Sequence, residues 1–233
     1  MSQPLYQTVY DAVLQRIATG VYGPGAMLPN EFDLADDLNV SQGTARKALM
    51  MLEQAGVVQR KQGRGTFVTL RTPETALFHF FRMRDAAGAQ VVPVLEHETV
   101  TRRAATVEER DGLYGAPGEV FEIARRRSFQ GKPMSLEWCI VPAALFPGLD
   151  ERAPLQNTIY VLFQQAYSCV VMTAEERLTA ELLSAENAVA MGVDAGLPVM
   201  VAYREARDLL GRVVELRRCI YLTDQMYYAV EMS

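Results

Sequence analysis

Residues 28–68 have the sequence LPNEFDLADDLNVSQGTARKALMMLEQAGVVQRKQGRGTFV, and this stretch decides the fold of the first part of the chain. Asn30 is a preferred N-cap residue, and the apolar residues after it are spaced as on a helix over residues 31–38. Ser41 is a second N-cap residue, and Gly56 is a typical helix stop. The pattern therefore predicts two helices joined by a tight turn, which is a helix-turn-helix.

The second helix of this pair has two distinct faces. Its apolar residues recur at helical spacing and predict a buried face. This face consists of Ala45, Ala48, Leu49 and Leu52. Polar and basic residues near the N-terminus of the helix, among them Arg46 and Lys47, are left to point outward. When such a helix enters the major groove of DNA, side chains at these positions reach base edges and phosphates.

The segment after this helix is basic and rich in glycine. Residues 60–68, RKQGRGTFV, predict two short strands joined by a turn, with Arg64 at the tip and placed to enter a minor groove. Residues 41–69 contain five basic residues against Glu53 alone, although the whole chain has a net charge of −5. A solvated basic face would account for a helix pair alone, but not for the added basic hairpin. The residues that we expect at the DNA are Ser41, Gln42, Gly43, Thr44, Arg46, Lys47, Arg64 and Gly65.

A wider pattern surrounds these residues. It includes Pro4-Leu5-Tyr6, Leu28-Pro29-Asn30-Glu31, Leu34-Ala35, Val40-Ser41, Thr44, Arg46, Ala48-Leu49 and Gly63-Arg64-Gly65-Thr66-Phe67-Val68. This pattern resembles the winged helix-turn-helix domain of GntR-family transcription regulators, which implies a double-stranded DNA operator as partner. Such domains place three arginines against the operator, and here only Arg46 matches, because Phe32 and Gln42 occupy the other two positions. Glutamine can still pair with adenine through two hydrogen bonds.

The rest of the chain alternates strands with helices. Residues 69–75, TLRTPET, are polar and contain proline, so we expect a linker over residues 70–76 between domains of residues 1–69 and 77–233. Strands are expected at Leu77–Met83, Val91–Thr101, Val120–Phe129, Met134–Val141, Val170–Leu178, Val199–Asp208, Val213–Tyr221 and Tyr227–Met232. Helices are expected at Thr106–Leu113, at Thr158–Tyr167 behind an Asn157 cap, and at Ser184–Met191. Hairpins with segregated helices predict an α+β domain with an antiparallel sheet.

A second pattern runs in order through this domain. It includes Arg125-x-Arg127, Gly131-x-Pro133, Glu137, Phe146-Pro147-Gly148-Leu149, Glu176, Gly196-x-Pro198, Arg204, Asp208, Gly211, Glu215 and Tyr221. It resembles the UTRA domain, a ligand-sensing domain of the HutC branch of the GntR family that shares its fold with chorismate lyase. The sequence departs from that pattern at Leu222, where an arginine is usual. The resemblance implies that the effector-binding residues are Arg125, Arg127, Glu137 and Tyr221.

The physical basis for such a site lies in one predicted hairpin. Arg125 and Arg127 share a face of one strand because strand side chains alternate, and Glu137 lies on the partner strand. Two guanidinium groups and one carboxylate can converge on an anionic or polyhydroxylated metabolite. The alternative is a cross-strand salt bridge that holds the hairpin and meets no ligand. Arg126 is expected to point to the opposite face and into solvent. A further set that fits ion pairs as well as ligand contacts consists of Glu176, Arg204 and Glu215.

Composition limits the class and the compartment of the protein. A chain of 233 residues with 49% hydrophobic content is long and apolar enough for two compact cores. No apolar run approaches the roughly 18 residues of a membrane-spanning helix, and no signal peptide opens the chain, so we expect a cytoplasmic protein without a membrane partner. Cys139, Cys169 and Cys219 are odd in number and widely spaced, which favours buried reduced thiols.

Catalytic and metal-binding interpretations have little support. His79 and His97 are the only histidines, and neither has Cys or acidic neighbours at ligand spacing. The sequence has no glycine-rich phosphate loop, serine nucleophile elbow or CxxC pair. We therefore expect no catalytic residue, metal or cofactor, and an enzyme of the chorismate lyase type remains the alternative that the resemblance allows.

The function that these patterns predict is sequence-specific transcriptional regulation. The family resemblance favours a repressor, and its operator affinity would respond to a small metabolite bound in the second domain. Operators of such domains are usually two half-sites about one helical turn apart, so we also expect a homodimer. A ligand-independent architectural DNA-binding protein would need no second domain with a pocket, and this chain has about two-thirds of its length there.

Overall fold

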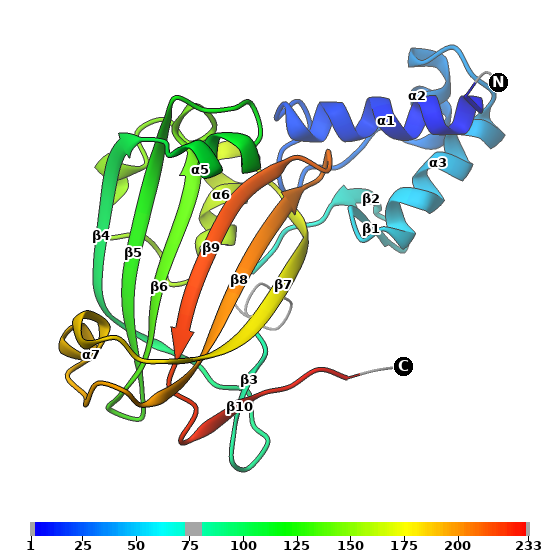
Figure 1. Cartoon of the computed structure of the whole chain (residues 1–233). Helices are drawn as coiled ribbons and strands as arrows, with labels where there is room; N and C mark the ends of the chain where they lie inside the picture. The colour runs from blue at the N-terminus through cyan, green and yellow to red at the C-terminus, as the bar shows by residue number, and fades with distance from the viewer. Residues whose placement is uncertain (1–2, 73–80, 232–233) are drawn as a thin grey trace. The chain divides into compact units, whose positions relative to one another are not determined.

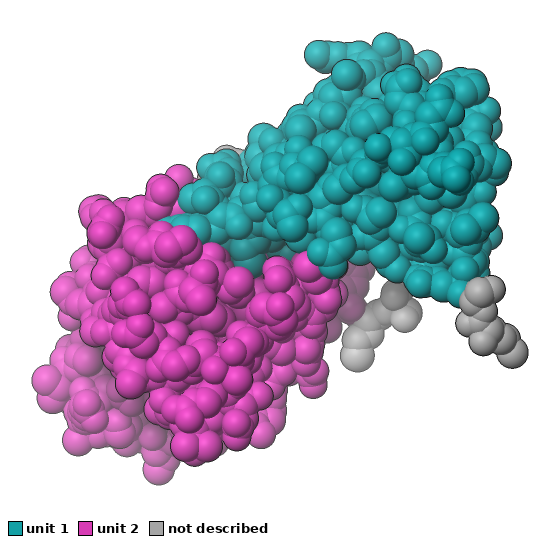
Figure 2. All heavy atoms as spheres, turned by 90° about the horizontal axis from the view of Figure 1, so that it is seen from above, with its two compact units in different colours: residues 1–72, 163–170 teal, residues 73–162, 171–233 magenta. Residues whose placement is uncertain are grey.

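The computed structural model describes residues 3–72 and 81–231. The chain divides into two compact units, which Figure 2 distinguishes by colour. Unit 1 contains residues 1–72 together with residues 163–170, and unit 2 contains residues 73–162 and 171–233. The division after Thr72 falls within the expected linker, of which residues 73–76 lie outside the described residues.

Unit 1 begins with the helix-turn-helix and a helix that precedes it. These helices are α1 (Leu5–Ala18), α2 (Glu31–Asp37) and α3 (Gln42–Gln54). The Asn30 side chain caps α2 by accepting hydrogen bonds from two backbone N–H groups, and the Ser41 side chain caps α3 by accepting one from the Thr44 N–H. Between the helices, Asn39 adopts a φ of 51°, a left-handed conformation that asparagine tolerates well. Both predicted caps are therefore confirmed.

The wing follows α3 directly. Its strands are β1 (Val58–Lys61) and β2 (Gly65–Val68), which pair antiparallel with Lys61 opposite Gly65. Gly63 has a φ of 69°, which lets the chain reverse in the short loop between them. The core of unit 1 includes Val13 of α1 and Leu52 of α3, each with an exposed fraction of 0%. The predicted winged helix-turn-helix is confirmed.

Unit 1 also contains the later residues of α6 (Ile159–Tyr167). Gln164 on this helix is fully buried, with an exposed fraction of 0%. Its side-chain oxygen accepts a hydrogen bond from the Arg71 N–H, and its side-chain nitrogen donates one to the Thr69 carbonyl, each at 2.8 Å. One amide side chain thus holds the backbone of the segment that follows the wing.

Unit 2 is built on a curved antiparallel sheet (Figure 1). Its strand order is β4-β5-β6-β9-β8-β7, so the sheet consists of two sets of sequential strands joined where β9 pairs with β6. The strands are β4 (Val94–Ala104), β5 (Glu119–Phe129), β6 (Lys132–Pro142), β7 (Val171–Leu182), β8 (Pro198–Asp208) and β9 (Val213–Tyr221). Among the described residues of unit 2, the helical elements other than α6 are α5 (Val107–Gly112), α7 (Ala185–Met191) and the 3-10 turns η1 (Ala143–Leu145) and η2 (Asp150–Arg152).

Two apolar clusters hold α5 and α7 at opposite ends of the sheet (Figure 1). Near α5, Leu113 packs with Val120 and Ile140, and near α7, Met191 packs with Val201. A capping box between Thr106 and Glu109 starts α5, and Ser184 caps α7. The predicted α+β domain with an antiparallel sheet is confirmed, because alternating strand residues bury one apolar set against these helices.

The two terminal strands of this unit differ from the sequence-based expectation. The strand expected at Leu77–Met83 is described only from residue 81, and the strand there is β3 (Met83–Asp85). It pairs with β10 (Met226–Tyr228) as a separate two-stranded ribbon, and β10 is shorter than the strand expected at Tyr227–Met232. The physical reason is packing, since Met83 and Met226 are buried in a cluster with Tyr221.

Candidate nucleic-acid interface and ligand cavity

The residues predicted at the DNA lie in exposed positions of unit 1. On α3, Gln42, Arg46 and Lys47 are exposed, whereas Ala45 and Ala48 on the same helix are buried. Arg64 is exposed at the wing tip, where its backbone N–H donates to the Lys61 carbonyl. The remaining predicted residues, Ser41, Gly43, Thr44 and Gly65, are exposed or half-buried. The N-terminus of α3 and the wing can therefore both be reached by a nucleic acid.

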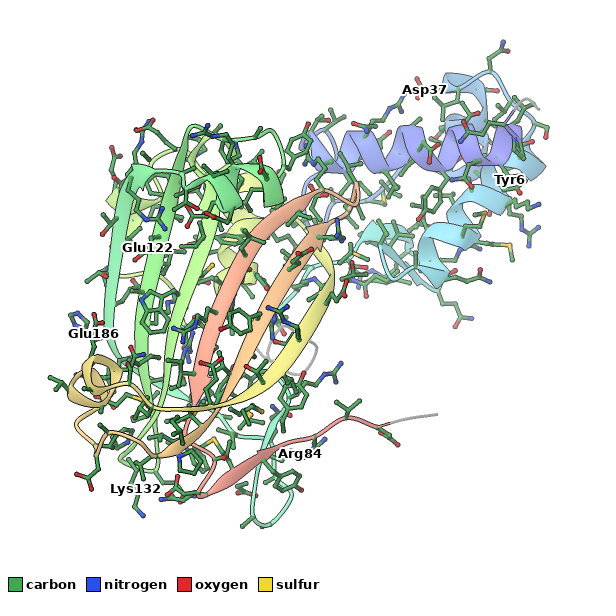
Figure 3. All side chains as sticks on the ribbon, in the orientation of Figure 1. Tyr6, Asp37, Arg84, Glu122, Lys132 and Glu186 are labelled. Carbon is green, nitrogen blue, oxygen red and sulfur yellow. The ribbon has the colours of Figure 1, made fainter. Side chains whose placement is uncertain are left out.

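Aromatic rings hold two of the cations beside this surface. The Lys47 ammonium lies 3.7 Å from the centroid of the Tyr6 ring, and Figure 3 labels Tyr6 near the start of α1. The Lys61 ammonium lies 4.8 Å from the centroid of the Phe67 ring on the wing. Such cation–π contacts limit the freedom of a long side chain at modest energy, so less conformational entropy is lost when it meets a phosphate.

A small cavity in unit 2 lies on one face of the sheet. Its volume is about 60 Å³, enough for a group of roughly four to six non-hydrogen atoms if each takes about 10–15 Å³. Arg127, Glu137 and Tyr221, which we expected at the effector, line it. Arg127 lies opposite Ser135, and Ser135 lies opposite Tyr221, so strand register brings them together. The other lining residues are Phe81, Ser135, Asn157, Thr158, Ile159, Tyr160, Arg204 and Arg217.

Glu137 is the buried carboxylate of this cavity. It accepts hydrogen bonds from Arg127 Nη2 at 3.4 Å and from Arg217 Nη1 at 3.0 Å. Burial alone would raise the pKa of Glu137, but the positive charges of Arg217 and Arg127 hold that pKa well below its ordinary value. Glu137 is therefore ionised at neutral pH and acts as a fixed anchor for two guanidinium groups.

Arg125 occupies a different environment from Arg127. It does not line the cavity, and its side chain is buried against Glu98 of β4, with Nη2 2.6 Å from the carboxylate. It also donates to the carbonyls of Gln156 and Asn157, at 2.9 and 3.1 Å. The salt bridge of the alternative interpretation, across the hairpin to Glu137, is made by Arg127 at 3.4 Å, whereas Arg125 pairs with Glu98 on the other neighbouring strand. Arg125 thus holds the segment before α6 onto the sheet.

Sequence reasoning missed several lining residues. Arg217 was not singled out, although it shares a strand face with Glu215, two positions before it, and with Tyr221, four positions after it. Asn157 was expected to cap α6, but its side-chain oxygen accepts from Arg127 Nη1 and its nitrogen donates to the Pro93 carbonyl. The period-two pattern of β9 was the signal that could have found Arg217. That pattern places Arg217 at the cavity only once β9 is known to lie beside β6, and the two strands are distant in sequence.

Three buried polar atoms of the cavity lack a hydrogen-bond partner among the described residues. They are Arg127 Nε, Ser135 Oγ and Arg217 Nη2. Buried polar groups are nearly always paired in native proteins, and each unpaired one costs about 1–3 kcal/mol. All three atoms can donate, so the cavity offers a set of donors to a group that only accepts. Within residues 3–72 and 81–231, no cluster of His, Cys, Asp or Glu is placed to hold a metal ion.

A winged helix-turn-helix combined with an antiparallel α+β domain defines a class of ligand-responsive DNA-binding regulators. The chain belongs to the bacterial regulatory proteins of the gntR family, whose model matches residues 5–68, and the UTRA domain model matches residues 88–227. It is a transcriptional regulator with a DNA-binding and an effector-binding domain, of the HutC type. No helix among the described residues has the length and apolar character that crossing a membrane requires.

Curated relatives and solved structures resemble both parts of the chain. The probable fructoselysine utilization operon transcriptional repressor of Escherichia coli (strain K12) is 33% identical over 180 residues, covering 76% of this chain and 73% of that protein. The histidine utilization repressor of Pseudomonas putida is 27% identical over 208 residues, covering 86% of this chain and 81% of that protein. The ligand-binding domain of a GntR-family regulator from Bordetella bronchiseptica has a TM-score of 0.60 at 25% identity, covering 66% of this chain and 98% of that one.

Proposed function

We propose that this regulator is a repressor that binds operator DNA through α3 and the wing and is released by an anionic metabolite bound in the cavity of unit 2. The observation that carries the effector part is the set of unpartnered donors on Arg127, Ser135 and Arg217. The repressor part is supported by relatives whose names describe repressors. The DNA-binding part is supported by the exposed basic residues of α3 and the wing.

The chemistry of the cavity favours a carboxylate or phosphate on the effector. Among the described residues, its lining contains the guanidinium groups of Arg127, Arg204 and Arg217 and one carboxylate, that of Glu137. All three arginines are ion-paired, Arg204 with Glu176 at 2.7 Å, Arg127 with Glu137, and Arg217 with Glu137 and Glu215. One guanidinium nitrogen each of Arg127 and Arg217 still has no hydrogen-bond partner among the described residues. Guanidinium groups bind carboxylate and phosphate oxygens in bidentate geometry, so an anion is the ligand that this lining fits.

The same residues support binding over acid–base catalysis. A carboxylate held ionised by two arginines, such as Glu137, cannot donate a proton at neutral pH. Burial raises the pKa of Tyr160 and of Tyr221, so neither phenol is a base at neutral pH. We therefore infer that the domain binds its ligand without turnover. Product formed from a chorismate-like substrate by purified protein would contradict this inference.

The effector site is tested by paired arginine variants. Arg127→Ala should weaken the binding of an anionic effector about 10- to 150-fold, because hydrogen bonds to charged groups contribute about 1.5–3 kcal/mol. Arg126→Ala is the matched control, because Arg126 is exposed and donates to the Ala190 carbonyl outside the cavity. Thermal-shift screening of a metabolite library with all three proteins provides the ligand and the comparison. Equal responses of the Arg127 and Arg126 variants would refute the site.

Ser135→Ala gives a second test that does not depend on a stable Arg127 variant. Ser135 is fully buried and its hydroxyl has no partner among the described residues. Removing an unsatisfied buried hydroxyl should leave the stability of the free protein unchanged or raise it by up to about 1 kcal/mol. Effector affinity should fall at the same time. A variant that loses stability and keeps full effector affinity would show that the hydroxyl serves the fold.

The DNA interface is tested with a selected operator. Duplexes that bind the full-length protein are first selected from a random pool. Arg46→Ala should then reduce the binding free energy for the selected duplex by about 1–3 kcal/mol if Arg46 makes a bidentate base contact. Lys132→Ala, at an exposed hairpin turn of unit 2, is the charge-matched control. Unchanged operator affinity of a folded Arg46 variant would place the base contact elsewhere.

We also propose a homodimer that pairs through the sheet of unit 2. The sheet face opposite the ligand cavity has a hollow of about 460 Å³ lined by aromatic, acidic and basic residues. They include Trp138, Tyr203, Arg177, Arg218, Glu175 and Glu205. Acidic and basic side chains lie beside two aromatic rings, so the basic residues of one copy can face the acidic residues of the other. A two-fold interface requires this kind of self-complementarity, because the same surface of both copies meets. A monomeric mass by light scattering at micromolar concentration, with and without the selected duplex, would contradict the dimer.

A further inference from the structure

We propose that Glu31, at the first position of α2, determines how well the DNA-binding surface distinguishes its operator from other DNA. The proposal rests on the DNA interface proposed above and goes beyond it, because Glu31 is an acidic residue inside a basic surface. Acidic side chains repel phosphates, so its presence there requires a reason. The contacts that Glu31 makes supply that reason.

Glu31 lies among three donors from two elements, α3 and the wing strand β1. Its carboxylate accepts from Gln42 Nε2 of α3 at 3.5 Å and from Arg60 Nη2 of the wing at 3.5 Å. Arg46 Nε of α3 lies 3.9 Å from the same carboxylate. Glu31 and Arg60 also line a groove of about 550 Å³ between the start of α2 and the wing. One carboxylate therefore connects the helix-turn-helix to the wing through residues that face outward.

These contacts affect specific and non-specific binding differently. Non-specific binding depends on the number of phosphates that cations can reach, and a carboxylate beside Arg46 and Arg60 reduces that number. Specific binding depends on base contacts, which require side chains in fixed positions. Gln42 and Arg46 are the residues that we expect at base edges. A carboxylate that holds both restricts their motion and repels misplaced phosphates, so it lowers the affinity for wrong sequences more than the affinity for the operator.

Glu53 provides a matched control on the same unit. Its carboxylate lies 3.2 Å from Arg60 Nε, which is closer than the contact of Glu31 with Arg60. The Glu53 side chain is 40% exposed and that of Glu31 is 25% exposed, so both are partly open to solvent. Glu53 lies near the end of α3, and no contact with Gln42 or Arg46 is found for it among the described residues. Glu31→Gln and Glu53→Gln therefore remove the same charge next to the same arginine, but only the first also releases Gln42 and Arg46.

The experiment measures the affinity of full-length protein for two duplexes over a range of salt concentrations. One duplex is the sequence selected from a random pool by the wild-type protein, and the other is a scrambled sequence of the same composition. In Glu31→Gln, affinity for the scrambled duplex should rise about eightfold at 0.1 M salt, because one more phosphate contact adds about 0.9 to the salt slope. The ratio of specific to non-specific affinity should fall about fivefold or more. In Glu53→Gln this ratio should stay within about twofold of wild type.

The outcomes separate this proposal from the proposed interface. An unchanged ratio in Glu31→Gln, or an equal fall in Glu53→Gln, would overturn the role of Glu31, because the effect would be absent or due to charge alone. Arg46→Ala is measured beside them. If Arg46→Ala leaves operator affinity unchanged, the interface itself is misplaced, whereas a loss in Arg46→Ala with no effect of Glu31→Gln rejects only the proposal for Glu31. Thermal melts show that each variant is folded, which the neighbouring Asn30 cap makes the expected result.

Discussion

Replacing Gln164 with Leu is expected to loosen the segment between the wing and unit 2. Gln164 is fully buried, and its amide pairs with both the Thr69 carbonyl and the Arg71 N–H at 2.8 Å. Leucine keeps the apolar volume but removes both hydrogen bonds. Leaving the Thr69 carbonyl or the Arg71 N–H without its hydrogen bond in a partly buried site costs about 1–2 kcal/mol each, so the segment should lose about 2–4 kcal/mol of local stability.

Limited trypsin digestion measures this loosening directly, because Arg71 is itself a trypsin site. When opening is fast, cleavage follows the population of the open state, so about 2–4 kcal/mol corresponds to roughly 30- to 1000-fold faster cleavage after Arg71. Gln165→Leu is the control, because Gln165 is the next residue on α6 and is exposed. Its effect on stability should stay within about 0.5 kcal/mol.

The result that would refute the reasoning is equal cleavage of the two variants after Arg71. A second measurement concerns regulation, since α6 also supplies Ile159 and Tyr160 to the ligand cavity. If this helix transmits the effect of the ligand, Gln164→Leu should bind both effector and operator while the effector changes operator affinity less than in wild type. If cleavage after Arg71 is faster but the effector still changes operator affinity as much as in wild type, α6 does not transmit the effect of the ligand.

Three further predictions concern charge and capping. The pKa of Glu137 is lowered from 4.5 in the folded state, so its ionised form stabilises the fold above about pH 4.5 and this contribution is lost as the pH falls below that value. In urea denaturation, wild type should therefore lose more stability than Glu137→Gln between about pH 5.5 and 3.5, and equal losses would contradict the pairing. Lys47→Ala should weaken the binding of all DNA sequences alike and reduce the slope of log affinity against log salt concentration by about one unit. Titrations at several salt concentrations measure this slope, and an unchanged slope would reject the phosphate contact. Asn30→Ala should cost about 0.5–2 kcal/mol in thermal unfolding, and no loss would mean that the cap hydrogen bonds at 2.9 and 3.0 Å contribute little.

Much of unit 1 could be predicted because its signals are local. The N-caps Asn30 and Ser41 and the apolar spacing of α3 lie within a few residues of the groups that they organise. The wing is a hairpin whose turn chemistry is encoded by adjacent residues. The contact of Glu31 with the wing could not be predicted in this way, because it joins Glu31 to Arg60, 29 positions apart in sequence.

The ligand cavity was only partly predictable. Period-two alternation correctly put Arg127 and Glu137 on one sheet face, and the hairpin made them neighbours. The same alternation could not separate Arg127 from Arg125, because both point to that face. Their roles differ because Glu98 and two backbone carbonyls occupy the donors of Arg125, and those partners come from other parts of the chain.

The sequence by itself determined the domain order, the helix-turn-helix with its wing, the strands of the second domain and the family. Those features depend on caps, turns and periodicity, which act over a few residues. Tertiary structure alone decided that β9 lies beside β6, that Arg217 therefore joins Glu137, and that Gln164 holds Thr69 and Arg71. These contacts join residues 76 or more positions apart. No local propensity encodes such a pairing, because the free energy that selects it comes from packing and burial of the whole sheet.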